Sequence, residues 1–268
     1  MRRLLPFALC LFVSCAKSSH APSAAFSGTM IDLSHPYDEQ TIFWPTAEPF
    51  RLEKVSDGFT DKGYYYAANN FCTAEHGGTH IDAPKHFAPN GNTVDRIPIE
   101  QLIGRAIVVD VSDKCAANPD YQVNISDFEA WEQRNGRIPD GAIVLLRTGY
   151  GKRWPDRTSY LGTDERGPEA VAKLHFPGLA PEAARWLTSK RSIKAIGLDT
   201  ASIDYGQSQL FESHRILFEH NVPAFENLAN LDRLPTKGFI VVALPMKIAG
   251  GSGGPLRAVA IISEGGAQ

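Results

Sequence analysis

The sequence predicts one mixed α/β domain, built on a mixed or antiparallel sheet, that follows a short N-terminal export segment. Segments typical of strands outnumber those typical of helices, and the helices interrupt the strands irregularly. No internal repeat, low-complexity block or linker follows residue 28. Because regular alternation of strands and helices is the pattern of a parallel sheet, these observations favour a mixed sheet instead.

The composition is that of an ordinary globular protein. Of the 268 residues, 43% are hydrophobic and 21% are charged, which suits one large domain. The formal net charge of −3 gives no general electrostatic reason to bind nucleic acid. Beyond the N-terminus no apolar run is long enough to span a bilayer, so we expect no transmembrane helix.

The first sixteen residues resemble a secretory signal peptide. Arg2 and Arg3 precede an apolar run over 4–13, and small residues around Ala16 suit a cleavage site. Residues 17–27 then form a disordered spacer, residues 28–268 form the domain, and the protein is secreted or periplasmic. An apolar strand or anchor is the alternative for this segment. A lipidated Cys15 would make the protein a lipoprotein, although Phe12 stands where such signals usually carry Leu.

Two cysteines, Cys72 and Cys115, remain after cleavage at Ala16. Export permits a disulfide between them, but the sequence does not supply its geometry. A buried free thiol at Cys72 is the alternative.

Short runs rich in β-branched and aromatic residues predict the strands. In chain order the predicted strands are 29–34, 50–56, 63–71, 104–111, 142–147, 194–199, 239–244 and 258–262. Residues 50–56 alternate apolar and polar side chains, which predicts a half-buried strand. His35, next to the turn that ends the first strand, is expected to be polar surface.

Helices are predicted at 126–135, 181–190 and 210–220. Ser126 is the expected N-cap of the first helix, with Glu129 closing a capping box, and Pro181 suits the first turn of the second. The polar, Gly-rich stretch 151–167 reads as a surface excursion or lid. The Gly-rich turn at 250–254 is not a nucleotide loop, because it lies between strands and lacks the Lys-Ser/Thr pair.

The densest chemical signal is Glu-His-Gly-Gly-Thr-His-Ile-Asp-Ala-Pro-Lys-His-Phe, residues 75–87. It contains four side chains that suit zinc or manganese: His76, His80, Asp82 and His86. The Gly pair disfavours a helix, so an extended run is expected, in which His80 and Asp82 point the same way. Pro84 allows a further turn that can return His86 to the site. The alternative is a surface loop whose histidines are solvated and bind no metal.

His214 and Glu226 are the best candidates to complete a metal site. On the predicted helix His214 shares a face with Leu210, Leu217 and Phe218, so it should point inward. Glu226 lies among apolar residues, and a buried carboxylate needs a cation or several hydrogen bonds. Taken alone, a histidine on an apolar helix face is more often a hydrogen-bonded core residue than a metal ligand. A metal ion shared with the first motif would explain why His214 points inward and why Glu226 lies among apolar residues.

With these residues in view, the chain resembles the cyclase family, which includes bacterial kynurenine formamidases and isatin hydrolases. His76-Gly-Gly-Thr-His80-Ile-Asp82-Ala-Pro-Lys-His86 resembles the family signature, and the likeness extends over roughly residues 29–262. Further matching elements are Trp44-Pro45, residues 197–202, His214 with Glu226-Asn-Leu, and residues 255–260. Thr46 and Ala47 depart from the Gly-Asp that formamidases tend to have, which leaves the exact substrate open.

The resemblance implies a swivelling β/β/α fold, a homodimer, and one or two divalent ions, zinc or manganese, per chain. It implies that His76, His80 and Asp82 bind one metal. Asp82 would bridge to a second ion held by His214 and Glu226. His86 would be the proton donor and acceptor, and Trp44, which by itself could be core packing, would line the substrate pocket.

The resulting hypothesis is a metal-dependent hydrolase of a small amide. The substrate would be an aryl formamide such as N-formylkynurenine or a cyclic amide such as isatin. Divalent metals can lower the pKa of bound water to about 7, and histidine suits proton transfer near neutral pH. Two alternatives stay open: a lactone-type hydrolase of the same fold, and a secreted metal-binding or interaction protein without catalysis.

Overall fold

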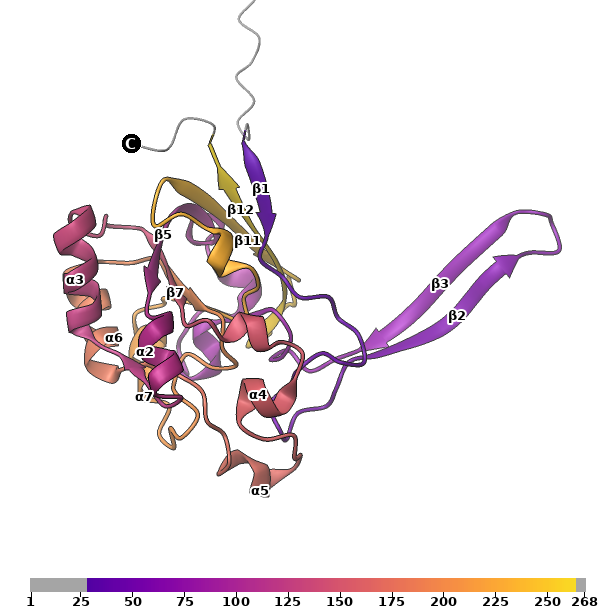
Figure 1. Cartoon of the computed structure of the whole chain (residues 1–268). Helices are drawn as coiled ribbons and strands as arrows, with labels where there is room; N and C mark the ends of the chain where they lie inside the picture. The colour runs from indigo at the N-terminus through magenta and orange to yellow at the C-terminus, as the bar shows by residue number, and fades with distance from the viewer. Residues whose placement is uncertain (1–27, 264–268) are drawn as a thin grey trace, which may run out of the picture.

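The structure, a computed structural model, describes residues 28–263. The predicted signal peptide and spacer lie outside the described residues. Figure 1 shows a sheet-centred body with helices gathered on one side and a long two-stranded arm projecting from the other. The main sheet consists of β1 Thr29–Asp32, β4 His80–Asp82, β5 Ile103–Asp110, β7 Ile143–Arg147, β9 Ala195–Leu198, β10 Ala224–Glu226, β11 Phe239–Pro245 and β12 Gly253–Ile262.

The sheet is mixed, as the sequence predicts. Its order is β1-β12-β11-β5-β7-β9-β10-β4. Neighbours among β5, β7, β9 and β10 run parallel, whereas β11, β12, β1 and β4 join by antiparallel pairing. Because β12 pairs with β11 near its end and with β4 near its start, the strands from β12 through β4 form a closed ring of hydrogen-bonded neighbours.

Seven helices accompany this sheet in the described part of the chain. They are α1 Ile99–Leu102, α2 Ser112–Ala117, α3 Ile125–Asn135, α4 Arg157–Leu161, α5 Pro168–Val171, α6 Pro181–Lys190 and α7 Glu212–Glu219. A short pairing of β6 Gln122–Val123 with β8 Gly178–Leu179 links the segments that lead into α3 and α6. None of these helices is long and apolar enough to cross a membrane.

Alternation along the parallel strands divides the apolar side chains between two cores. Val144 and Leu146 of β7 face a core shared with residues of α3, α6 and α7, including Phe128 and Leu187. Ile143 and Leu145 of the same strand face the opposite core, inside the closed ring of strands. Both faces of β7 are therefore buried, which explains its continuous apolar sequence.

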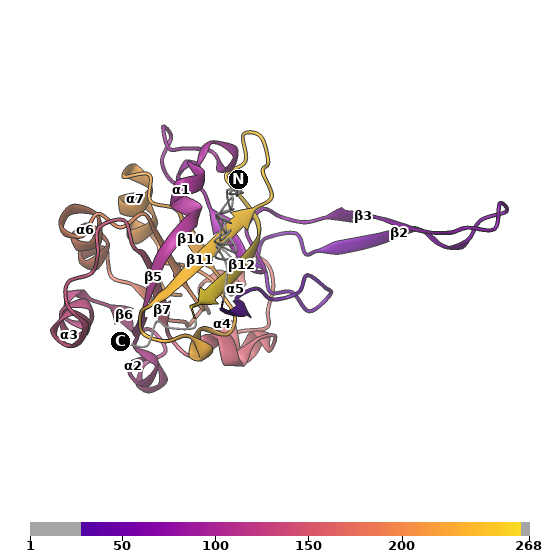
Figure 2. The same ribbon diagram turned by 90° about the horizontal axis from the view of Figure 1, so that it is seen from above.

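The arm consists of β2 Arg51–Phe59 and β3 Tyr65–Cys72, which pair antiparallel with an irregularity at Lys54–Ser56. It projects away from the body in both views (Figures 1 and 2). The prediction of a half-buried strand at 50–56 is wrong, because β2 is exposed along most of its length. Alternation of apolar and polar residues shows that the two faces of β2 differ. No other segment within residues 28–263 packs closely enough on either face to bury the strand.

Three further expectations need correction. The N-cap of α3 is Asn124, with Asp127 closing the capping box, because the helix begins at Ile125, one residue before Ser126. Residues 151–167 are not simply a surface excursion, since Tyr160 and Leu161 of α4 are fully buried. Cys72 and Cys115 are both free thiols, with Cys72 exposed and only Cys115 buried.

Candidate metal centre

Strand pairing places three of the predicted ligands on one face of the sheet. In the antiparallel pair of β4 and β10, Glu226 lies opposite His80 and Ala224 lies opposite Asp82. Residues two apart on a strand share a face, so His80, Asp82 and Glu226 project together. All three are at most 3% exposed. The register of two short strands thus joins segments that are far apart in the sequence.

His76 reaches the same site because the chain bends sharply before β4. Gly78 has a left-handed φ of +57°, and a Cβ there would lie 2.6 Å from the Tyr37 ring. Gly253 of β12 lies opposite Asp82, and a Cβ on it would lie 2.6 Å from Cε1 of His76. The absence of a side chain at Gly253 therefore leaves the space that the His76 ring occupies.

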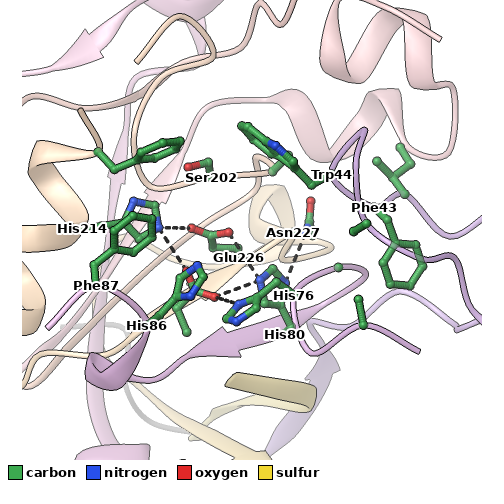
Figure 3. Close-up of a pocket in the computed structure, with 17 residues that line it drawn as sticks. Phe43, Trp44, His76, His80, His86, Phe87, Ser202, His214, Glu226 and Asn227 are labelled. Atoms are coloured by element: carbon green, nitrogen blue, oxygen red, sulfur yellow. Dashed lines mark hydrogen bonds and ion pairs between the residues drawn. The ribbon is translucent and has the colours of Figure 1, made fainter. Parts of the chain in front are cut away.

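His214 enters the site from α7, on the buried face that it shares with Leu217 and Phe218. Leu210, which the prediction placed on the same face, precedes the helix and is 66% exposed. Its Nε2 lies 3.1 Å from Asp82 Oδ2 and 3.1 Å from Glu226 Oε1. The predicted convergence of the two distant clusters is therefore present, and Figure 3 shows His214 and Glu226 beside His76 and His80 in the pocket.

Two groups of side chains have donor atoms close enough to hold a metal ion. The first is His76, His80 and Asp82, and the second is Asp82, His214 and Glu226, each with its atoms within 4.8 Å of one another. Asp82 belongs to both: Oδ1 lies 2.6 Å from His76 Nδ1, and Oδ2 faces His214. Imidazole nitrogens with buried carboxylates form a donor set that suits zinc or manganese. The residues present thus fit a divalent ion.

Each of the three histidines has its other ring nitrogen held by an acceptor. His80 Nδ1 donates to the Gly78 carbonyl at 3.0 Å, and His214 Nδ1 donates to Asp204 Oδ2 at 2.6 Å. His76 Nε2 donates to Ser252 Oγ at 2.9 Å, while the Ser252 hydroxyl donates to Glu75 Oε2 at 2.6 Å. These bonds orient each ring so that its second nitrogen faces the site, where it would be an unprotonated ligand if a metal is bound.

The two carboxylates are electrostatically distinct. Burial by itself raises the pKa of Asp82, but the charge of His76 and hydrogen bonds from the surrounding histidines outweigh burial and hold that pKa well below its usual value. Burial raises the pKa of Glu226, and the neighbouring Asp82 carboxylate raises it further. A divalent cation would offset this crowding of buried negative charge.

His86 lies beside the two groups rather than within them. It ends the short 3-10 turn η1 Pro84–His86, and its ring stacks on that of His76 with centroids 3.8 Å apart. Burial lowers the pKa of His86 to about 4, although Asp82 acts in the opposite direction. Burial therefore favours the neutral imidazole at the edge of the site, and the predicted role of His86 as proton donor and acceptor stays a prediction.

A cavity of about 320 Å³ opens over the two groups. Trp44 lines it and makes edge-on contacts with Phe176 and Phe211, while its predicted contact with substrate stays a prediction. Phe43, Phe87 and Phe211 add further aromatic surface. The cavity thus has a charged floor and an apolar aromatic wall (Figure 3).

The sequence reasoning missed the residues that hold the ligands in place. Asp204, Ser252 and Glu75 orient imidazoles, and Asn227 donates to the Gly78 carbonyl at 2.7 Å while accepting from the Tyr160 hydroxyl at 2.9 Å. Of these residues, only Asn227 could have been suspected from the sequence, because it directly follows the candidate ligand Glu226. The other three act through contacts between separate segments, which local patterns do not reveal.

Comparison with known proteins places this site in context. The family described as Putative cyclase matches residues 31–205. The isatin hydrolase of Roseibium aggregatum is 36% identical over 221 residues, covering 80% of this chain and 81% of the relative. A kynurenine formamidase of Bacillus cereus is 29% identical, covering 85% of this chain and 95% of the relative.

The fold is also that of a solved isatin hydrolase bound to the product analogue thioisatinate. That structure has a TM-score of 0.79 and 31% identity to this chain, covering 88% of this chain and 92% of its own. The likeness confirms the predicted fold class. These relatives are an isatin hydrolase and a kynurenine formamidase, both hydrolases of C–N bonds other than peptide bonds, which favours an enzyme over a metal-binding protein without catalysis. Matches of this extent show that the chain belongs to the cyclase family and is a metal-dependent hydrolase.

Proposed function

We propose that this enzyme hydrolyses the ring amide of isatin or a closely similar cyclic aryl amide. The five candidate ligands, His76, His80, Asp82, His214 and Glu226, would hold one or two divalent ions, zinc or manganese. Support comes from the higher identity to isatin hydrolase than to kynurenine formamidase and, above all, from the lining of the cavity.

The observation that carries the choice of substrate is the charge of the cavity wall. Among the described residues that line it, none is Lys or Arg, and the surface above the charged floor is largely aromatic and aliphatic. N-formylkynurenine carries the carboxylate and ammonium of an amino acid, and desolvating these charges without partners is costly. Isatin is an uncharged fused ring, which an aromatic cavity can bury without that cost.

A divalent ion supplies activation of water near neutral pH and stabilises negative charge on the carbonyl oxygen. The chain's own residues carry out the remaining steps. His86 accepts the proton of the attacking water and returns it to the ring nitrogen as the C–N bond breaks. The water oxygen becomes part of the new carboxyl group, which releases its remaining proton to solvent, so the ring opens to an amino acid anion. Trp44 and Phe211 hold the ring and exclude bulk water.

A direct comparison of substrates tests the proposal. The purified protein, loaded separately with Zn²⁺ or Mn²⁺, is assayed by absorbance on isatin and on N-formylkynurenine. We expect kcat/KM for isatin to exceed that for N-formylkynurenine by at least tenfold. Equal or faster hydrolysis of N-formylkynurenine would refute the assignment, and a lactone in the same panel tests the wider alternative.

Three further parts of the proposal concern the whole protein. Residues 1–16 act as a signal peptide, residues 28–268 form the catalytic domain, and the enzyme is secreted or periplasmic. Mass spectrometry of the N-terminus after expression in the native host tests cleavage near Ala16. The working form is a homodimer, which sedimentation equilibrium of the full-length chain tests.

A further inference from the structure

The lining of the cavity over the candidate metal centre contains, besides the indole of Trp44, eight polar side chains. Five of them are the candidate ligands, and Asn227 is held by its bonds with the Gly78 carbonyl and the Tyr160 hydroxyl. The other two are His86 and Ser202, whose side chains make no hydrogen bond to any residue in 28–263. Because ligand cavities use a few polar groups to orient the ligand, a free polar group in the lining is a candidate contact.

The Ser202 side chain is almost fully enclosed. Ser202 is 5% exposed, and Figure 3 shows its hydroxyl among the side chains that surround the pocket. Buried hydroxyls nearly always have a hydrogen-bond partner, since leaving one unpaired costs free energy. A ligand in the cavity can supply that partner.

The backbone around Ser202 is held in place. The Ser202 carbonyl accepts the Thr200 hydroxyl at 3.2 Å, and the N–H of Ile203 donates to Glu226 Oε1 at 2.7 Å. The Ile203 carbonyl in turn accepts the N–H of Leu179 at 2.7 Å. The Ser202 backbone is therefore fastened beside a candidate metal ligand, and it does not have to be ordered when a substrate binds.

Ser202 and His86 lie on opposite sides of the charged floor. In Figure 3 Ser202 lies on one side of Glu226, and His86 lies on the other. The proposed ring opening requires His86 near the ring nitrogen of isatin, because it returns a proton to that atom. In isatin the scissile carbonyl carbon is bonded to this nitrogen on one side and to the ketone carbon on the other. A substrate that places its nitrogen at His86 therefore directs its ketone toward Ser202.

We propose that the Ser202 hydroxyl donates a hydrogen bond to the ketone oxygen of isatin, so that Ser202 selects a cyclic α-keto amide over a simple lactam. The inference rests on the proposed hydrolysis of isatin. The acceptor is absent from oxindole, a lactam that differs from isatin only in having a CH₂ group in place of the ketone. A site that hydrogen-bonds a substrate group rejects the analogue without it, because its own polar group is then left unpaired.

The contact also assists the reaction without a covalent step. A hydrogen bond to the ketone draws electron density from the adjacent amide carbonyl, which becomes a better target for the attacking water. Ser202 forms no bond to carbon, and the ketone survives in the ring-opened product. A nucleophilic hydroxyl needs a base within hydrogen-bond reach, and no imidazole or carboxylate of residues 28–263 forms a hydrogen bond with this one.

Steady-state kinetics on isatin is the first test. Ser202→Ala, loaded with Zn²⁺ or Mn²⁺ like the wild type, should lower kcat/KM about 10- to 100-fold, with metal content and thermal unfolding unchanged. Ser202→Cys is nearly the same size but carries a weak donor, so it should lose a similar factor. Wild-type kcat/KM in Ser202→Ala would overturn the inference and point to the indole N–H of Trp44 as the donor. A wild type that hydrolyses N-formylkynurenine faster than isatin would refute the proposed function, and the inference with it.

Binding measured without turnover separates recognition from catalysis. Calorimetry in the His86→Ala background, where turnover is expected to be slow, gives the dissociation constants of isatin and of oxindole. Adding Ser202→Ala should weaken isatin binding about tenfold and leave oxindole binding unchanged. Oxindole is the matched control, since it has the same ring system and lacks only the acceptor. Equal weakening of both ligands would indicate a change in cavity shape, and unchanged isatin binding would indicate no contact; either result overturns the inference.

Discussion

Asp204→Asn is the sharpest test of how the candidate metal centre is held. The Asp204 carboxylate is buried, accepts from His214 Nδ1 at 2.6 Å, and also accepts the backbone N–H groups of Ser213 and His214 at 3.1 Å. Burial raises the pKa of Asp204, but the hydrogen bond and charge of His214 outweigh it and lower that pKa. Asp204 is therefore an anion whose main partner is the His214 ring.

An amide whose oxygen takes the place of Oδ1 keeps the bond from the Ser213 N–H but removes the acceptor of the His214 N–H, which donates to Oδ2. Its NH₂ group would then face His214 Nδ1 and favour the ring tautomer with the proton on Nε2. That nitrogen faces Asp82 and Glu226, so the ring would no longer offer a lone pair there. Loss of such a supporting partner typically weakens metal binding 10- to 100-fold, or by about 1.4 to 2.7 kcal/mol.

Calorimetric titration with Zn²⁺ and Mn²⁺ measures this effect without relying on turnover. We expect weakened binding only at the group of Asp82, His214 and Glu226, with the group of His76 and His80 retained. Ser208→Ala is the matched control, because Ser208 contacts the other oxygen of Asp204 at 3.3 Å and does not touch the ring. Unchanged metal affinity in Asp204→Asn would refute the proposed orientation of His214.

Three other predictions concern turnover, substrate binding and pH. His86→Ala should lower kcat by about 10²- to 10⁴-fold, while elemental analysis shows full metal content; normal turnover would exclude His86 as the proton carrier. Trp44→Ala should raise KM for isatin roughly tenfold through lost aromatic contact, and a pure loss of kcat would argue against a pocket role. Burial lowers the pKa of His35 from 6.5 to about 4, with Asp32 opposing. The folded state therefore favours the neutral ring. This preference contributes at most about 3 kcal/mol to the free energy of unfolding. The contribution is fully present above pH 6.5 and is lost as the pH falls to 4. Urea unfolding should show a weaker pH dependence in His35→Phe, which can keep the stacking on Trp154, and an identical dependence would contradict this account.

His35 also corrects an expectation drawn from the sequence. A histidine next to a turn was expected to be polar surface, yet its ring stacks on Trp154 at 4.2 Å, and Nε2 is buried without a hydrogen-bond partner in the described chain. The turn next to His35 indicates where the backbone changes direction, but it does not indicate whether the His35 side chain is buried. Trp154 belongs to a distant segment, so the burial of His35 depends on packing that no local pattern records.

The sequence by itself determined the mixed fold class, the family and the chemistry of the candidate site. Local spacing sufficed for His80 and Asp82, since alternation on a strand fixes their shared direction. Helical periodicity sufficed for the inward direction of His214. These properties depend on neighbours within a few positions, which a single sequence contains.

Tertiary structure decided the properties that depend on which segments meet. The register of β4 with β10 brings Glu226 opposite His80, and only the folded chain brings Asp204 to His214 and Ser252 to His76. Tertiary structure also left both faces of the arm exposed, although its alternating sequence indicates a buried face. Alternation fixes the direction of a side chain, whereas its burial depends on long-range packing against another segment, or another copy, of the chain.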